Sequence, residues 1–456
     1  MPAPRESMHG LWSSRWVFIL AATGSAVGLG NIWRFPYVTG ENGGGAFVLI
    51  YLACVVLVGL PIMAAEILIG RRGRRSPINA VAALASDDGL HRSWRALGWI
   101  GVFAGFLILS FYSVVAGWSL AYVYLVAVGE FAGATVTTSQ DIFGSLTGSA
   151  PRLLWWHTLF MGMTMFVVAR GVRGGLEQAV KLLMPTLFII LILMVGYAVS
   201  TGDFSGALRY LFQPDFSKIN DESFLMALGQ AFFSLSLGMG SIMIYGSYLP
   251  ADASIPRTVV AVGLADTVVA VLAGLAIFPI VFGYGLEPGQ GPGLVFVTLT
   301  IAFGHMPGGQ LFGSLFFVLL SVAAWTSAIS LLEPVVAWVV ESAGWSRLKA
   351  CLVAGVSAWV LGFGSLLSFN LGSEWVLGGR NFFDWAEFIS TTVLLPLGGL
   401  LIAIFAGWKM ARSSTVEELG VGTGITYQTW KFLARFVAPI GVALIFVNAI
   451  KQAFAE

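Results

Sequence analysis

Stretches of mostly apolar residues follow one another along almost the whole chain. A helix needs about 20 such residues to cross the hydrocarbon core of a bilayer. Only 10% of the residues are Asp, Glu, Lys or Arg, whereas soluble domains average about 25%. So few charges cannot cover the surface of a water-soluble protein of 456 residues. The sequence therefore predicts an all-α protein that crosses the lipid bilayer many times.

The apolar stretches predict eleven spanning helices, at residues 12–38, 43–71, 96–128, 151–169, 175–200, 223–249, 257–284, 310–341, 348–369, 379–408 and 427–450. The region Glu287–Gly309 is rich in Gly and Pro and is long for a turn, so we expect short helices within it. The first apolar stretch is too long for a cleavable signal and has no small-residue cleavage box, so it should remain in the protein.

The basic residues predict the orientation. With the N-terminus in the cytoplasm, 18 of the 24 Lys and Arg residues lie on the cytoplasmic side and six lie outside. This is the positive-inside pattern, and the run Arg71–Arg75 is its strongest marker. We interpret that run as a topology signal rather than as a lipid-binding site. An odd number of spans then puts the C-terminus outside, in a multi-pass protein of the cell inner (cytoplasmic) membrane.

Several kinds of function find no support in the residues. The net charge of +1 gives no reason to expect a nucleic-acid partner. Cys54 and Cys351 lie in apolar stretches and are interpreted as small buried side chains. The four histidines have no metal-ligand spacing. Because no catalytic pairing of His with Cys or of two acids is present, we do not expect an enzyme.

Two apolar stretches carry breaks at matching places. The first has three glycines within Gly24–Gly30, and each weakens a helix by about 1 kcal/mol relative to alanine. The sixth has a similar segment at Ser234–Gly240. One such segment could simply permit close helix packing. Two of them, each opening a set of five helices, favour a binding site at the interface of two inverted repeats.

This pattern predicts one transporter domain over residues 1–456, with a first repeat at 12–200, a second repeat at 223–408 and a last helix at 427–450. A break leaves backbone carbonyls that can coordinate a hard cation such as Na⁺. The half-helix beyond the break offers free amides and a positive dipole end to an anion. One break can therefore hold a sodium ion and a carboxylate together.

The motifs Trp12–Arg15, Gly24–Asn31 and Ile32–Tyr37 resemble the first helix of the neurotransmitter:sodium symporter (NSS, solute carrier 6-like) family. The resemblance continues in Gly229–Gly240, Ser247-Tyr248 and Trp325–Pro334, and it covers essentially the whole chain. It points to the bacterial amino acid transporter branch with the leucine transporter fold. It implies a 5+5 inverted-repeat protein with helices one and six unwound at mid-membrane. Its implied activity is sodium-coupled import of an α-amino acid by alternating access.

The resemblance also implies two sodium sites and a substrate site. The first sodium site would use Ala26, Asn31, Ser234 and Asp266, and the second would use Gly24, Val27, Ala323, Thr326 and Ser327. Such hard oxygen ligands suit an alkali or alkaline-earth cation. The substrate site would be formed by Ala26, Gly28, Leu29, Gly30, Ile108, Tyr112, Phe233, Ser234, Ser236, Met239, Ser327 and Leu331.

The family's gates carry over in the same way. Both expected gates on this side lie between the substrate site and the extracellular space. Phe233 would be the inner lid, and Arg34 with Asp384 would form the outer gate pair. Glu66 would hold the unwound part of helix six, because an acid at that depth needs a partner. Trp12 and Tyr248 would support the inner side. At the inner gate His9 stands at the position of the family's arginine, with Glu341 as the expected acid, and Arg5 lies further off; no inner pair is assigned.

Three further positions refine the expected function. Family members that carry monoamines place aspartate where this chain has Gly28, so an α-amino acid that brings its own carboxylate is favoured. Chloride-dependent relatives have asparagine at the position of Asp266 and serine one turn later, where this chain has Ala270. Asp266 would supply the charge that chloride supplies elsewhere, so no chloride is expected. It could also take up a proton in the emptied carrier.

Met239, Ile108 and Leu331 indicate a large apolar pocket, which favours hydrophobic or aromatic substrates. In the fifth helix, Gly175 and Pro185 have the spacing of a segment that unwinds in a related transporter, although a simple proline kink is an equal alternative. A non-transporting amino acid sensor on the same fold remains the main alternative function. An intramembrane enzyme and a channel are further alternatives.

Overall fold

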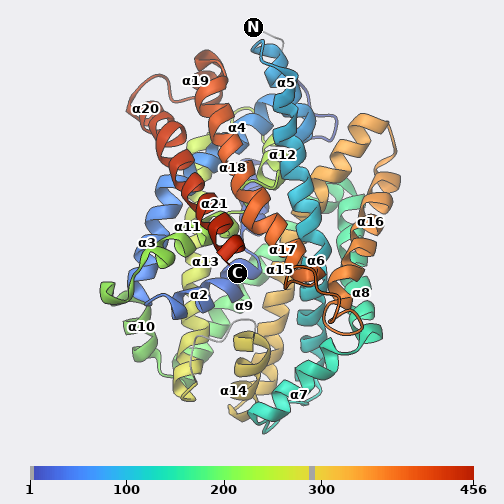
Figure 1. Ribbon diagram of the computed structural model, residues 1–456, viewed down its shortest axis with the longest axis vertical. Coiled ribbons are helices and arrows are strands. Elements are labelled where there is room, and N and C mark those ends of the chain that lie inside the picture. Colours follow the sequence, from blue (N-terminus) through green and yellow to red (C-terminus); the bar gives the residue numbers. More distant parts are fainter. Residues whose placement is uncertain (1–4, 287–292, 456) are drawn as a thin grey trace.

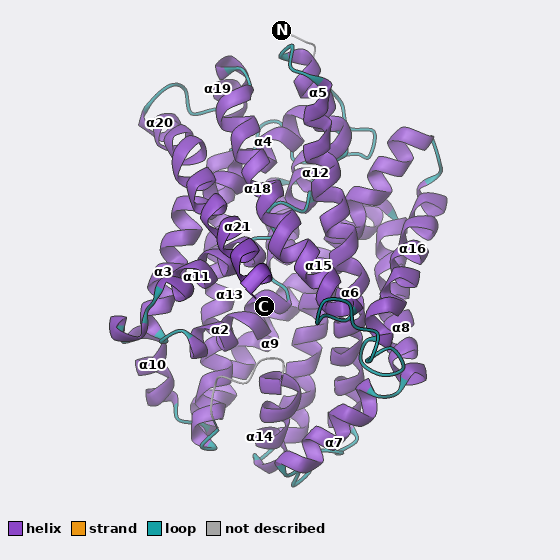
Figure 2. Cartoon of the chain, viewed as in Figure 1, coloured by secondary structure: helices purple, strands orange, loops and turns teal. Residues whose placement is uncertain are grey.

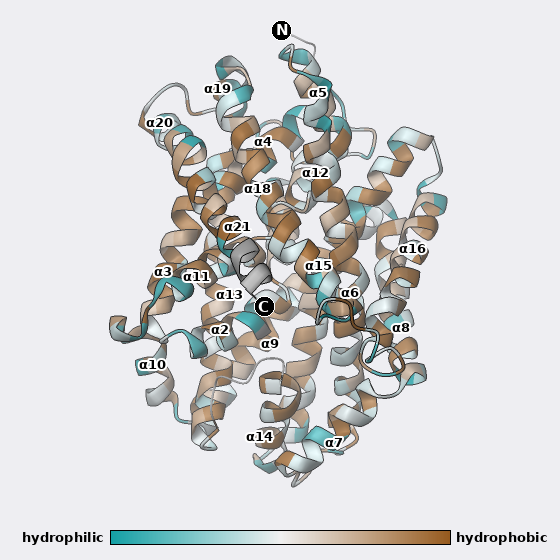
Figure 3. Cartoon of the chain, viewed as in Figure 1, coloured by the Kyte–Doolittle hydropathy of each residue, from teal (hydrophilic) through white to brown (hydrophobic). Residues whose placement is uncertain are grey.

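The computed structural model describes residues 5–286 and 293–455. Within these ranges the regular structure is helical, with two isolated bridges besides (Figure 2). Hydrophobic residues predominate along the long helices, while many of the hydrophilic ones lie in the short helices and loops (Figure 3). This distribution is the one expected for a protein whose middle is surrounded by lipid.

Nine helices in the described ranges are long and apolar enough to cross a membrane. They are Gly45–Gly73 (α3, Gly45–Cys54, and α4, Leu60–Gly73), Arg92–Ala127 (α6, Arg95–Ala127), Ala150–Ala169 (α8), Val172–Thr201 (α9, Glu177–Thr201), Ile255–Gly283 (α13), Gly309–Ala343 (α15), Arg347–Leu367 (α16), Phe382–Lys409 (α17, Phe382–Glu387, and α18, Leu395–Ile404) and Ile425–Asn448 (α20, Ile425–Phe432, continuing into α21, Ala438–Ala455). Each of these spans falls on a predicted apolar stretch.

The first predicted helix is bent rather than broken over a long segment. Its two parts, Arg15–Ala26 (α1) and Gly30–Glu41 (which ends in α2, Phe35–Glu41), meet at 62° and together make a tenth span. The expected break at Ser25–Asn31 is shorter here, because only Val27 and Gly28 leave the helix. The N–H of Val27 still closes on the Thr23 carbonyl at 2.6 Å, and the N–H of Asn31 already bonds the Gly28 carbonyl at 3.2 Å.

The sixth predicted helix is divided into α11 (Asp221–Ser234) and α12 (Ser241–Ser247). The chain between them turns through left-handed conformations at Ser236 (φ 53°), Gly238 (φ 80°) and Gly240 (φ 75°). Glycine adopts this conformation without a steric penalty, which explains the two glycines of the segment. Because α11 and α12 are each shorter than a span, the total of eleven spans stays a prediction.

The fifth helix has no unwound segment in this structure. Gly171 is left-handed (φ 81°), a π-helical turn follows at Val172–Leu176, and α9 then continues through Pro185 to Thr201. For Gly175 and Pro185 the alternatives were an unwound segment or a simple proline kink. In this conformation the helix is continuous and contains the proline.

Short helices lie at both ends of the bundle (Figure 1). The N-terminus, α5 (Pro77–Asp87) and α19 (Arg412–Leu419) lie at one end, and α7 (Val136–Thr147), α10 (Phe204–Phe212) and α14 (Leu299–His305) lie toward the other. The helical segment Leu294–His305 agrees with the expectation of short helices in Glu287–Gly309. Residues 287–292 of that region lie outside the described residues.

Burial separates the central helices from the peripheral ones. In the most apolar window of each span, 83% of the residues are buried in Arg92–Ala127 and 78% in Gly309–Ala343, against 17% in Ile425–Asn448. Helices α6 and α15 therefore lie inside the bundle, whereas α21 faces lipid. Both interrupted helices pack onto this centre, since α1 contacts α15 and α12 contacts both α1 and α15.

Candidate functional site

A small cavity of about 30 Å³ lies where α1, α6, α11 and α15 meet. It is lined by Ser25, Ala26, Gly28, Leu29, Gly30, Ile108, Tyr112, Phe233, Ser236, Met239, Ser327, Ser330 and Leu331. Every residue expected at the substrate site lines this cavity except Ser234, which points into a neighbouring polar cluster. Ser25 and Ser330 were not expected, and their hydroxyl groups bond each other at 2.8 Å.

Gly28 forms the tightest corner of the cavity. A Cβ at this position would lie 2.6 Å from Ser327 Oγ and 3.0 Å from the Tyr112 hydroxyl, so the position has no room for a side chain. The N–H of Leu29 donates to the Tyr112 hydroxyl at 3.3 Å. The same hydroxyl can donate its own proton in turn. The corner thus combines a hydroxyl donor with main chain at the start of a helix, which are groups that bind a carboxylate.

Asn31, Ser234 and Asp266 form a buried polar cluster next to this corner. Asn31 Nδ2 donates to Asp266 Oδ1 at 2.8 Å, and Ser234 Oγ donates to Asp266 Oδ2 at 2.7 Å. The Tyr51 hydroxyl lies 3.3 Å from the same Oδ2 and 3.2 Å from Ser234 Oγ. All four side chains are buried. Tertiary folding thus assembles three residues of the first expected sodium site around one carboxylate, beside Ala26 in the cavity wall.

Three of the five residues of the second expected sodium site, Gly24, Val27 and Ser327, come into contact. Ser327 Oγ lies within hydrogen-bond distance of the carbonyl oxygens of Gly24 (3.4 Å), Ser25 (3.2 Å) and Val27 (3.3 Å). Thr326 Oγ1 donates to the Ala323 carbonyl at 3.0 Å. The end of α1 therefore presents carbonyl oxygens to the Ser327 hydroxyl of α15, whereas the Thr326 hydroxyl is bonded within its own helix.

Three buried polar side chains hold the interrupted segments. Glu66 Oε1 accepts a hydrogen bond from the Gly238 N–H at 2.7 Å, so the acid of α4 contacts the non-helical segment of helix six as expected. Gln230 Nε2 donates to the Gly30 carbonyl at 2.9 Å. Ser236 Oγ donates to the Ser25 carbonyl at 2.7 Å. Backbone groups released at each break thus find partners on another element.

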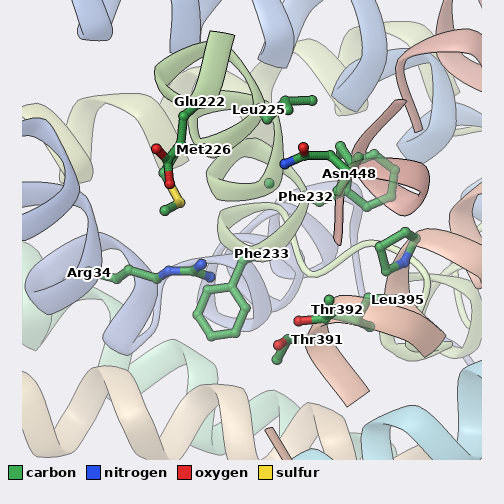
Figure 4. A pocket seen from close by; sticks show the side chains of 13 residues that line it. Arg34, Glu222, Leu225, Met226, Phe232, Phe233, Thr391, Thr392, Leu395 and Asn448 are labelled. Carbon is green, nitrogen blue, oxygen red and sulfur yellow. The ribbon is translucent and has the colours of Figure 1, made fainter. Parts of the chain in front are cut away.

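Phe233 separates the central cavity from two outer cavities of about 220 and 270 Å³, because its ring lines all three. A Cβ at Gly30 would lie 2.8 Å from the Phe233 ring, and the Arg34 guanidinium lies 5.0 Å from the ring centroid on the other side. Figure 4 shows Arg34 and Phe233 pointing toward each other at the edge of the smaller outer cavity. This arrangement fits the expected lid.

The structure does not bring Asp384 to Arg34. Asp384 forms a capping box with Asn381, in which Asn381 N donates to Asp384 Oδ2 at 3.1 Å and Asp384 N donates to Asn381 Oδ1 at 3.0 Å. Over the ranges that the structure describes, no ion pair joins Arg34 and Asp384. Glu387, three residues later, lines the 270 Å³ cavity together with Arg34. The expected outer pair is therefore not formed in the described chain, where Asp384 instead caps its own helix.

The opposite side of the cavity is covered by the N-terminal segment. Trp12 N donates to the Tyr248 carbonyl at 3.0 Å, and Trp12 Nε1 donates to the Tyr245 carbonyl at 3.1 Å. His9 Nε2 lies 3.0 Å from Glu341 Oε1, while Arg5 pairs with Asp87 at 2.8 Å. Of the two alternatives for the inner gate, His9 is the residue that meets Glu341.

Sequence reasoning missed Tyr51, Gln230, Ser25, Ser330 and Glu387. Gln230 and Glu387 carried a usable signal, because a polar or ionisable side chain inside an apolar span is expensive and needs a partner. The serines and Tyr51 carried none, since such residues are common in membrane helices and usually bond their own backbone or a neighbour.

Comparisons with known proteins agree with this geometry. The model of the sodium:neurotransmitter symporter family matches residues 9–140 and 145–456. An uncharacterized sodium-dependent transporter of Bacillus subtilis, YhdH, is 39% identical over 96% of this chain and 97% of its own length. An uncharacterized sodium-dependent transporter of Haemophilus influenzae is 34% identical, with 96% and 97% covered.

A solved structure, the crystal structure of MhsT in complex with L-phenylalanine, matches with a TM-score of 0.89 and 44% identity, covering 96% of this chain and 99% of that chain. This match confirms the predicted all-helical fold class. The family match and the sodium-dependent relatives identify a transporter rather than an enzyme. The chain therefore belongs to the sodium:neurotransmitter symporter family and is a sodium-dependent transporter.

Proposed function

We propose that this protein imports a hydrophobic or aromatic α-amino acid together with Na⁺, by alternating access and without chloride. The observation that carries the proposal is the Gly28 corner, where Ser327 and Tyr112 leave no room for a side chain. A substrate that brings its own carboxylate to the Tyr112 hydroxyl and the nearby amides suits this corner. A monoamine would have no acid there to pair with.

The cluster around Asp266 fits the first sodium ion. Its oxygen groups are a carboxylate and two hydroxyls, which are hard ligands of the kind that alkali cations take, while Asn31 turns its Nδ2 toward the carboxylate. Asp266, Asn31, Ser234 and the Ala26 carbonyl would hold this ion beside the substrate carboxylate. The carbonyls of Gly24, Val27 and Ala323, with the hydroxyls of Thr326 and Ser327, would hold a second one.

Chloride independence follows from the charge of Asp266. The carboxylate accepts hydrogen bonds from Asn31, Ser234 and Tyr51, which stabilise its ionised form. Ala270, one turn later on α13, offers no hydroxyl to an anion. A fixed negative charge therefore lies beside the proposed sodium site. A chloride ion at this place would be repelled by the Asp266 carboxylate.

The apolar part of the lining favours a hydrophobic substrate side chain, but the cavity of about 30 Å³ is smaller than the large pocket expected from the sequence and must widen to admit a bulky one. Ile108, Met239 and Leu331 line the cavity, and Met239 has a flexible, polarizable side chain that adapts to different shapes. The similar transporter MhsT was crystallised in complex with L-phenylalanine, and aromatic amino acids are the class we assign to this chain.

Substrate entry would involve Phe233 and Arg34, with Glu387 as the acid that faces Arg34 across the outer cavity. The strongly basic Arg71–Arg75 segment lies at the same end of the molecule as the N-terminus, which suits a cytoplasmic N-terminus in the inner membrane.

The test is binding and uptake by the purified protein with a panel of amino acids. We expect tight binding of phenylalanine, tryptophan and leucine only with Na⁺, and uptake into proteoliposomes driven by an inward Na⁺ gradient. Choline in place of Na⁺ should abolish both. Sodium-dependent binding without uptake would instead identify a sensor, and sodium-independent binding of every ligand would overturn the proposal.

A further inference from the structure

Ser25 and Ser330 form a hydroxyl pair in the wall of the central cavity. Both residues line the cavity, and each is only 1% exposed. Ser25 belongs to α1 and Ser330 to α15, and their hydroxyl oxygens lie 2.8 Å apart. Neither hydroxyl belongs to the proposed sodium sites or to the Gly28 corner, so the function proposed above makes no use of the pair.

The hydrogen bonds of the pair determine where its protons point. Ser330 Oγ donates to the Ser327 carbonyl at 2.8 Å, which uses its single proton. Ser25 Oγ therefore donates to Ser330 Oγ. A hydroxyl has one proton and two acceptor lone pairs, and within the described chain no N–H or O–H donates to Ser25 Oγ. The pair therefore offers a hydrogen-bond acceptor to the cavity, and the protons of both hydroxyls are already used.

The pair lies deeper in the cavity than the groups proposed for the substrate carboxylate. Ser25 precedes Gly28 by three residues, and Ser330 follows Ser327 by three residues on α15. Three residues of α-helix rise about 4.5 Å. Both steps lead toward the N-terminal segment, because this segment precedes α1 and contacts Glu341 near the end of α15.

The apolar part of the lining lies at the same depth. Leu331 directly follows Ser330, and Ile108 precedes Tyr112 by about one turn of α6. The residues before Tyr112 lead toward the same end, since α6 packs against α5, which lies at the end that carries the N-terminus. A substrate whose carboxylate is held at the Gly28 corner therefore directs its side chain toward Ser25 and Ser330.

We propose that Ser25 is a specificity-determining residue that accepts a hydrogen bond from the N–H or O–H of an aromatic substrate side chain. This inference rests on the proposed function and narrows its substrate class to aromatic amino acids with a donor on the ring, tryptophan and tyrosine. The indole N–H is a donor only, which matches an oxygen whose own proton is already used. Phenylalanine and leucine would occupy the same apolar space and leave the acceptor unmatched.

The test is equilibrium binding to the purified full-length protein in Na⁺, with pairs of amino acids that differ in one group. Tyrosine is compared with phenylalanine, and tryptophan is compared with β-(3-benzothienyl)alanine, in which sulfur replaces the ring N–H. We expect the donor-bearing member of each pair to bind roughly fivefold more tightly, the ratio that one ordinary net hydrogen bond produces. Equal or weaker binding of both donor-bearing members would overturn the proposal.

Two variants assign the preference to the hydroxyl of Ser25. Ser25→Ala removes the acceptor and leaves Ser330 bonded to the Ser327 carbonyl, so both ratios should fall to about one. Each ratio cancels any general effect of the substitution on the site. Ser241→Ala is the matched control, because this hydroxyl bonds the Ser330 carbonyl at 2.9 Å but does not line the cavity. It should keep the wild-type ratios. Ratios that persist in Ser25→Ala would assign the acceptor to another hydroxyl and overturn the proposal.

The same measurements separate the role of Ser25 from the function on which it rests. Sodium-dependent binding of phenylalanine without any preference for tyrosine would remove only the role of Ser25. Absence of sodium-dependent binding for every amino acid tested would overturn the proposed function itself, and the specificity of Ser25 with it.

Discussion

Asn31 of the bent first helix and Asp266 of α13 are joined by a hydrogen bond of 2.8 Å in a site that water does not reach. The two residues are far apart in the sequence and belong to different predicted repeats. Because Ser234 and Tyr51 bond the other carboxylate oxygen, one acid joins three other helices at the proposed first sodium site. The properties of that acid lead to the first prediction.

Asp266→Asn should weaken sodium binding by about tenfold or more, because the site loses a full charge next to the cation. The wild-type protein should take up substrate equally well in chloride and in gluconate. Asp266→Asn combined with Ala270→Ser supplies a neutral amide and a hydroxyl in the arrangement of chloride-dependent relatives, and we expect uptake to become chloride-dependent. Flux assays with anion substitution measure all three.

Loss of wild-type uptake in gluconate would contradict the chloride prediction directly. Ala270→Ser alone serves as the control for the added hydroxyl. It should remain chloride-independent, since Asp266 still provides the charge.

Gly28→Ala should lower amino acid affinity by at least about tenfold, since overpacking a tight site costs about 1–3 kcal/mol. The physical cause is the methyl group 2.6 Å from Ser327 Oγ. Scintillation proximity binding measures the dissociation constant. Gly196→Ala in α9 is the matched control, because a Cβ there meets nothing within 4 Å. Equal affinity in both variants would remove Gly28 from the carboxylate site.

Glu66→Ala should lower the free energy of unfolding by about 1–3 kcal/mol, because the buried N–H of Gly238 loses its acceptor. We also expect weaker substrate binding, since the non-helical segment carries Ser236 and Met239 into the cavity. Thermal unfolding in detergent and binding are measured together. Glu66→Gln retains an oxygen acceptor and should lose less stability than alanine. If the two variants are equally destabilised, the acceptor role is wrong.

Glu387→Gln should reduce uptake about fivefold, which corresponds to about 1 kcal/mol for two opposite charges that line one partly exposed cavity. The reason is that Arg34 loses the acid that shares its outer cavity. Asp384→Asn keeps an oxygen for the Asn381 cap and should leave uptake near the wild-type value. Uptake at subsaturating substrate measures both. The reverse order of effects would restore Asp384 as the partner of Arg34.

Local patterns were sufficient to predict most of the helices. The 29 residues Gly45–Gly73 and the 35 residues Gly309–Ala343 are spans by their apolar length alone. The interruption in helix six was readable because glycines at 238 and 240 take left-handed conformations. The break in helix one is shorter than the number of glycines predicted. The amides of Val27 and Asn31 still bond the carbonyls of Thr23 and Gly28.

The residues of the site were predicted from motifs, but their pairings were not. Asp384 and Glu387 both lie near the start of the tenth predicted helix, and the sequence offers no measure of which acid faces Arg34. The cap formed with Asn381 occupies Asp384. In the same way, the sequence aligned His9 with the inner-gate position but assigned no pair with Glu341, and the course of the N-terminal segment brings His9 to it.

The sequence by itself determined that the chain is helical, that it resides in a bilayer, where its helices weaken and which residue types are available for sodium and a carboxylate. These follow from hydropathy and backbone propensity, which act over one or two helical turns. Only the tertiary structure decided which carbonyl meets which hydroxyl, that Tyr51 supports Asp266, and that His9 closes on Glu341. Hydrogen bonds act over about 3 Å, so a shift of one helical turn changes the partner without changing the sequence pattern.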